Sequence, residues 1–126
     1  MAIHHTLRCM TSPEQQLIHQ AYDAFNRRDI DAVLQLMHPE VQWPNGWEGG
    51  YVYGHEAVRA YWTRQWQVLD PHVEPVSINE KPDGRFDVQV HQVVKDREGT
   101  LLMDRHLAHI YTFRNGLVLK MEIEEP

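Results

Sequence analysis

The first half of the chain places apolar residues at helical spacing. A helix is predicted to begin after Ser12, whose side chain can accept the backbone N–H of Gln15. The apolar positions that follow it match one face of a helix, at Leu17, Ile18, Ala21, Ala24 and Phe25. A second, short helix is predicted over residues 29–38, ended by Pro39, and a third over residues 55–69.

In the second half, apolar residues alternate with polar ones, which is the period of a β-strand. The predicted strands, with a short one ahead of the third helix, cover residues 41–43, 72–79, 86–94, 101–113 and 117–123. A three-residue loop at 114–116 would pair His109 with Met121. The turn at 96–99 needs a two-residue loop or a bulge to keep its apolar rows on one face.

Helices followed by a long meander predict a segregated α+β domain. We expect three N-terminal helices to pack in the concave face of a curved antiparallel sheet. The 126 residues are enough for one domain. That domain is expected to cover residues 12–126, with residues 1–11 as a flexible N-terminal segment.

Composition and charge narrow the class of protein. A hydrophobic share of 42% and a charged share of 24% are typical of a soluble globule. The net charge of −6 argues against a nucleic-acid-binding surface. The single cysteine, Cys9, excludes an intrachain disulfide, and no apolar run approaches the ~18 residues that cross a bilayer. We therefore expect a cytoplasmic protein whose partners include neither nucleic acid nor membrane.

Polar residues that interrupt the apolar rows are the candidates for chemistry. Gln92, Arg105 and His109 stand where the strand pattern demands apolar side chains, with Tyr111 close by. A guanidinium inside an apolar cup is costly unless it is paired. One interpretation is a concave pocket whose polar end these residues form. The other is a set of interior groups that hydrogen bond to backbone or water and carry no chemistry.

His109 is the candidate for proton transfer, because histidine titrates near neutrality. No carboxylate joins it, since Asp104 and Glu122 fall on the outward parity of their strands. The nine histidines show no spacing typical of a metal site, so no metal ligand is predicted.

The segment from Trp43 to Trp62 is rich in aromatic residues and glycine. Its glycines would let the loop at 44–54 act as a lid over an apolar ligand. Alternatively, the loop packs as a rim onto its own helix.

Four short stretches carry a resemblance to a known family. They are Ala24-Phe25-Asn26-Arg27-Arg28-Asp29, His38-Pro39-Glu40-Val41-Gln42-Trp43, Gly54-His55-Glu56-Ala57-Val58 and His109-Ile110-Tyr111-Thr112-Phe113-Arg114-Asn115-Gly116. In this order the chain resembles the nuclear-transport-factor-2-like superfamily, in its SnoaL-like and ketosteroid-isomerase-like branch, over residues 12–125. The resemblance implies a cone-shaped α+β barrel with an apolar pocket, commonly a dimer through the outer sheet face. Members isomerise, cyclise or dehydrate small polycyclic or terpenoid molecules without cofactors, bind ligands, or mediate protein contacts.

The family's catalytic residues carry over only in part. The isomerase branch's aspartate base falls on Asn45, and its oxyanion tyrosine falls on Ala21, next to Tyr22. Its oxyanion aspartic acid falls on His109, which also matches a histidine of the polyketide-cyclase branch. The general base of that branch falls on Ile123. The chain therefore keeps the cup and its histidine but matches none of these catalytic sets in full.

These observations favour a SnoaL-like pocket protein for a small apolar or polycyclic carbonyl or hydroxyl compound. As an enzyme it would be a cofactor-free isomerase, cyclase or dehydratase, with His109 as acid or base and Arg105 beside it. The residues expected to bind the ligand are Gln92, Tyr111, Trp43, Asn45, Tyr61, Trp62 and Met121. The alternative is a non-catalytic ligand-binding or protein-interaction module.

A homodimer is expected through the outer face of the sheet. The outward row of the long strands is more apolar than an exposed face usually is, with Leu102, His106, Ala108, Ile110, Thr112 and Val118.

Overall fold

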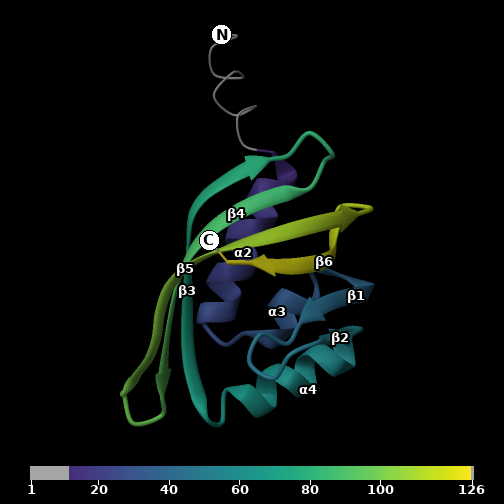
Figure 1. The fold of residues 1–126 in the computed structure, drawn as a ribbon. Helices are drawn as coiled ribbons and strands as arrows, with labels where there is room; N and C mark the ends of the chain where they lie inside the picture. Colours follow the sequence, from purple (N-terminus) through teal and green to yellow (C-terminus); the bar gives the residue numbers. More distant parts are fainter. Residues whose placement is uncertain (1–11, 126) are drawn as a thin grey trace, which may run out of the picture.

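The computed structural model describes residues 12–125 as a helical layer packed on one curved sheet (Figure 1). The helices are α2 (Pro13–Asn26), α3 (Ile30–Leu34) and α4 (His55–Gln65). The strands are β1 (Met37–Pro44), β2 (Tyr51–Tyr53), β3 (Leu69–Glu80), β4 (Phe86–Asp96), β5 (Leu101–Arg114) and β6 (Leu117–Glu124). The flexible segment predicted over 1–11, Cys9 included, lies outside the described residues.

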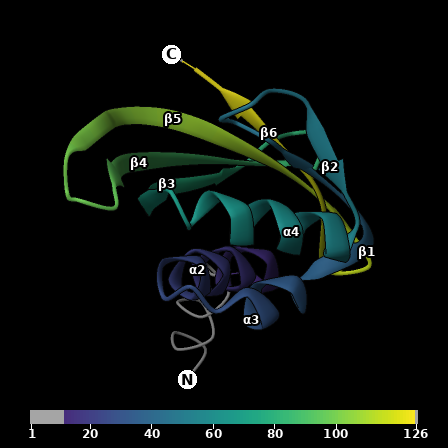
Figure 2. The same ribbon diagram turned by 90° about the horizontal axis from the view of Figure 1, so that it is seen from below.

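The sheet has six strands in the order β2-β1-β6-β5-β4-β3. It curves strongly around the helices without closing, and Figure 2 shows all three helices on its concave side. The α+β prediction is confirmed, but the expectation of a purely antiparallel sheet is wrong, because β1 pairs with β6 in parallel.

Helix α2 begins where the sequence predicts. The Ser12 side chain accepts the backbone N–H of Gln15, whose own side chain accepts the backbone N–H of Ser12. The helix buries Ile18, Tyr22 and Ala24 against the sheet. Tyr22 follows Ile18 by four residues, so both side chains lie on the same face.

The second predicted helix is too long. Helix α3 ends at Leu34, and the chain is already extended at Met37, where β1 begins. Proline disfavours the helical conformation of the residue before it, so Pro39 places His38 in a strand rather than in a last helical turn. The third helix is shorter than predicted as well, because β3 takes over at Leu69.

The β5–β6 hairpin turns through two residues, not the predicted three. Asn115 and Gly116 have φ angles of 54° and 79°, as a type I′ turn requires. A register shift follows between Thr112 and Phe113, which puts Val118 in the core and pairs His109 with Ile123 instead of Met121. The bulge keeps the apolar rows of both strands on one face.

The β4–β5 hairpin contains the bulge that the sequence required, between Val94 and Lys95. Gln92 then lies opposite Arg105. In Figure 1 this hairpin projects past the helices, and most of the first residues of β5 are exposed.

The outer face is less apolar than the sequence suggested. Val118 belongs to the core, and Ile110 is fully buried although it lies between Asp87 and Glu122 in the register. Leu102 remains 47% exposed.

Candidate functional site

A cavity of about 160 Å³ lies between the helices and the concave face of the sheet. It is comparable in size to an engineered cavity of about 150 Å³ that binds one benzene ring. Its walls are mostly apolar and aromatic, and include Phe25, Trp43, Trp62, Leu107 and Met121. The cavity is open to the surface, since its lining also includes Trp47, which is 48% exposed. A single ring therefore fits inside, and a larger ligand would extend through the opening.

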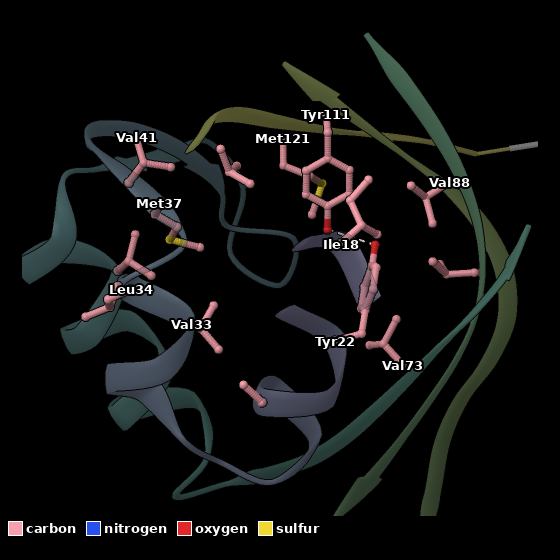
Figure 3. Close-up of a cluster of buried hydrophobic side chains, with 14 of the residues drawn as sticks. Ile18, Tyr22, Val33, Leu34, Met37, Val41, Val73, Val88, Tyr111 and Met121 are labelled. Carbon is pink, nitrogen blue, oxygen red and sulfur yellow. Dashed lines mark hydrogen bonds between the residues drawn. The ribbon is translucent and has the colours of Figure 1, made fainter. Parts of the chain in front are cut away.

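Three buried side chains from α2 and β5 form a chain of hydrogen bonds on the cavity wall. The Tyr111 hydroxyl donates to the Tyr22 hydroxyl at 2.8 Å, and Figure 3 shows the two directed toward one another. The Tyr22 oxygen lies 2.7 Å from Nδ1 of His109. Because Tyr22 accepts from Tyr111 and has its own proton to give, it donates to Nδ1. A neutral imidazole with Nδ1 as acceptor carries its proton on Nε2.

Burial fixes the protonation states of these three hydrogen-bonded side chains. It lowers the pKa of His109 to about 4, because a charged imidazole loses its hydration there. Burial likewise raises the pKa of Tyr22, with a further contribution from Tyr111, and raises the pKa of Tyr111. At neutral pH all three groups are uncharged, so the cavity wall presents hydrogen-bonding groups rather than an ion.

We infer that Nε2 of His109 faces the cavity, because His109 lines the cavity and its other ring nitrogen, Nδ1, is occupied by Tyr22. Nε2 has no hydrogen-bond partner within residues 12–125. The only sealed, partnerless side-chain polar atom in the same part of the chain is Trp66 Nε1. The arrangement offers one oriented N–H to a ligand oxygen.

The cavity brings most of the predicted site residues together. Its lining includes His109, Arg105, Gln92, Tyr111, Trp43, Tyr61, Trp62 and Met121. Asn45 does not line the cavity. Its side chain accepts the backbone N–H of Glu48 and donates to the Glu48 carboxylate, and these hydrogen bonds stabilise the loop between β1 and β2.

Arg105 lies at the mouth of the cavity rather than inside the apolar cup. Its side chain is 44% exposed and forms an ion pair with Glu125. The helices do not reach this part of β5, so the guanidinium stays in water and needs no buried partner. Gln92, opposite it in the register, is half-buried.

Tyr22 is the site residue that sequence reasoning missed. Tyr22 was not counted among the apolar residues of the first helix because it carries a hydroxyl, although it follows Ile18 by one helical turn and so lies on the same face. That spacing was the available signal, and the pairing with His109, 87 positions away along the chain, depends on the tertiary fold.

Within residues 12–125, no group of three or more histidine, cysteine or acidic side chains is arranged to hold a metal ion. No helix in the same range is long and apolar enough to cross a membrane.

Comparison with family models identifies residues 18–121 as a SnoaL-like domain. The chain belongs to the SnoaL-like family. This match spans most of the chain, and the three helices on a strongly curved sheet are consistent with the NTF2-like cone fold. Comparison with curated proteins gives no match.

Solved structures of similar proteins support the same assignment. TerC, co-crystallized with polyporic acid, is 30% identical, with a TM-score of 0.79 over 91% of this chain and 92% of that one. An NTF2-like protein of unknown function from Burkholderia pseudomallei is 25% identical, with the same TM-score and coverage. Rv0760c from Mycobacterium tuberculosis, in complex with estradiol-17β-hemisuccinate, shares the fold at 16% identity, with a TM-score of 0.77 over 89% and 92% of the two chains.

Proposed function

We propose that this SnoaL-like protein binds a small, mostly apolar ring compound and polarises its carbonyl or hydroxyl oxygen with Nε2–H of His109. The observation that carries the proposal is the neutral, oriented imidazole on the wall of an apolar cavity. The co-crystal of the 30% identical TerC with polyporic acid supports a ligand of this general kind.

This geometry supplies one part of cofactor-free acid–base chemistry, the stabilisation of an oxyanion. When a proton passes from the carbon next to a ligand carbonyl to a base, here a water molecule at the mouth or a basic group of the ligand itself, the C–H electron pair moves into the C–C bond and negative charge develops on the carbonyl oxygen. A hydrogen-bond donor already aimed at that oxygen, in a site with little water, stabilises the charge as it forms. Tyr22 keeps the imidazole in the donating tautomer by occupying Nδ1. Isomerisation, cyclisation and dehydration of such a compound all pass through a step of this type.

Ligand binding without turnover is the second candidate, and one observation favours it. Glu125 is the only carboxylate among the cavity-lining residues 12–125, and it lies at the mouth in an ion pair with Arg105. Within the described part of the chain, the interior of the cavity has no carboxylate that could act as a base beside His109.

Thermal unfolding with a panel of ring ketones, quinones and polyporic acid tests the binding. A ligand at one hundred times its Kd adds about 2.7 kcal/mol to the stability of the native state, a shift of several degrees at this size. We expect such a shift in the native protein and a much smaller one in His109→Phe. Equal shifts in both proteins contradict the proposal.

Deuterium exchange separates the two candidates. An enzyme would speed the exchange of the protons next to a bound ketone's carbonyl with D₂O, as followed by NMR. A binding module would give the thermal shift without this exchange.

A homodimer through the outer face and a cytoplasmic location stay part of the proposal. The exposed Leu102 and the stacked rings of His91 and His106, with centroids 4.7 Å apart, lie on that face. Light scattering at micromolar concentration should give twice the chain mass, and a monomeric mass would rule the dimer out.

A further inference from the structure

We propose that the mouth of the cavity is a second polar subsite, in which Arg105 and Gln92 bind an anionic group of the ligand in place of Glu125. The inference rests on the proposed function, since it describes the other end of a ligand whose oxygen reaches His109. It assigns the ligand to a class: ring compounds with a carbonyl at one end and an acidic group at the other.

The first observation concerns charge. Among the residues 12–125 that line the cavity, Arg105 alone is positive and Glu125 alone is negative. The whole chain carries a net charge of −6, so a cation at the opening is the one feature there that attracts an acidic ligand. The interior is uncharged, and the one cation of the lining within residues 12–125 lies at the mouth, which favours a ligand with an apolar body and an anionic end that replaces Glu125 on Arg105.

The second observation is that Glu125 is held weakly. Both side chains of the ion pair are well exposed, at 44% and 59%, and such pairs add little to stability. Glu125 also lies beyond the last residue of β6, so no strand pairing fixes it. A ligand carboxylate can therefore take its place on Arg105 at little cost.

The third observation is an unused amide next to the guanidinium. Gln92 lies opposite Arg105 in the β4–β5 register, lines the cavity, and makes no side-chain hydrogen bond within residues 12–125. A guanidinium offers paired N–H donors that match a carboxylate, and the Gln92 amide adds another donor beside it. The pair forms a receptor for an acidic group.

The fourth observation is spacing. Arg105 and His109 are four residues apart on the same face of β5, which separates their Cα atoms by about 13 Å. Leu107 lies between them and lines the cavity. A one- or two-ring body would lie over Leu107, with its carbonyl at His109 and its acidic group at the mouth.

The test uses two matched pairs of probes. Acetophenone is compared with 4-acetylbenzoate, and 2-acetylnaphthalene with 6-acetyl-2-naphthoate, by calorimetric titration of the full chain. We expect the acid of at least one pair to bind about tenfold more tightly than the neutral ketone, the order of a charge-assisted hydrogen bond. The preference should disappear in Arg105→Gln and grow in Glu125→Gln.

Arg114→Gln is the matched control, because Arg114 is also an exposed arginine paired with a glutamate, Glu40, but does not line the cavity. It should keep the preference for the acid. The subsite is contradicted if the acids bind no more tightly than the neutral ketones, or if their tighter binding persists in Arg105→Gln. In either case, binding of the neutral ketones through His109 leaves the proposed function intact. If none of the four probes binds, both the subsite and the proposed function are contradicted.

Discussion

Tyr22 is the central residue of the buried hydrogen-bonded group, because it lies between Tyr111 and His109 and bonds to both. Replacing it with phenylalanine leaves two buried groups unpaired, the Tyr111 hydroxyl and Nδ1 of His109. Tyr111→Phe removes only a donor to Tyr22. Since an unpaired buried polar group costs about 1–3 kcal/mol, we predict that Tyr22→Phe lowers the free energy of unfolding clearly more than Tyr111→Phe does. Denaturation in urea measures both, and equal losses would contradict the hydrogen-bond order described here.

His109 gives the protein a pH dependence of known sign. Its pKa falls from 6.5 to about 4 on folding, so between these values the unfolded chain binds a proton that the native protein does not. Stability from this group is complete above pH 6.5 and is lost as the pH falls toward 4, by about 3 kcal/mol in total. Denaturation at pH 7 and pH 4.5 should show this loss in the native protein and less of it in His109→Gln. His19→Gln, at an exposed position, should behave like the native protein.

At the level of single residues, the sequence predicted His109 as a site residue but did not predict which side chains contact it. His109 stands out as a polar residue in an apolar row, and the structure places it in the cavity wall. Arg105 has the same parity, yet it is exposed, because strand parity says which face a side chain takes and not how far the helices extend over that face. Tyr22 depends on a contact between segments far apart in the chain.

At the scale of elements, Asn26 fastens the end of α2 to the edge strand β3. Its side chain donates to the carbonyl of Val73 at 2.8 Å and accepts the N–H of the same residue at 3.0 Å. Strand β3 is the last of the sheet, so these backbone groups have no neighbouring strand to pair with. One side chain thus replaces a missing strand.

We predict that Asn26→Ala destabilises the protein by about 2 kcal/mol or more, because both backbone groups of Val73 lose their partner. Asn79→Ala, at an exposed position on the same strand, is the control and should change little. Urea denaturation compares the two. A loss in Asn26→Ala no larger than in the control would show that water satisfies the edge equally well.

The elements themselves were largely predictable where the signal is local. The Ser12 cap, the alternation in β4 and β5 and the need for a bulge near Val94 all follow from neighbouring residues. The bulge of the β5–β6 hairpin was not predicted, because a three-residue loop and a two-residue loop with a bulge satisfy the same apolar pattern. The choice between them reverses the position of Val118, which is buried.

At the scale of the molecule, the cavity exists because helices and sheet meet along only part of their surfaces. The sheet curves around the helices, which lie on its concave side (Figure 2), and the cavity is lined by side chains from both layers. The resemblance to the family predicted this shape. The parallel pairing of β1 with β6 could not be predicted from periodicity, because it joins two segments that lie far apart in the sequence. The polar mouth at Arg105 follows from the same curvature.

The central claim is that a neutral His109 presents Nε2–H to the cavity. Nitrogen-15 NMR of the histidine side chains tests it most directly, with His109→Phe to assign the signals. At pH 7 we predict a neutral imidazole with its proton on Nε2 and an unprotonated Nδ1, and a shift of the Nε2 signal when a ring ketone binds. An imidazolium, or a proton on Nδ1, would contradict the account.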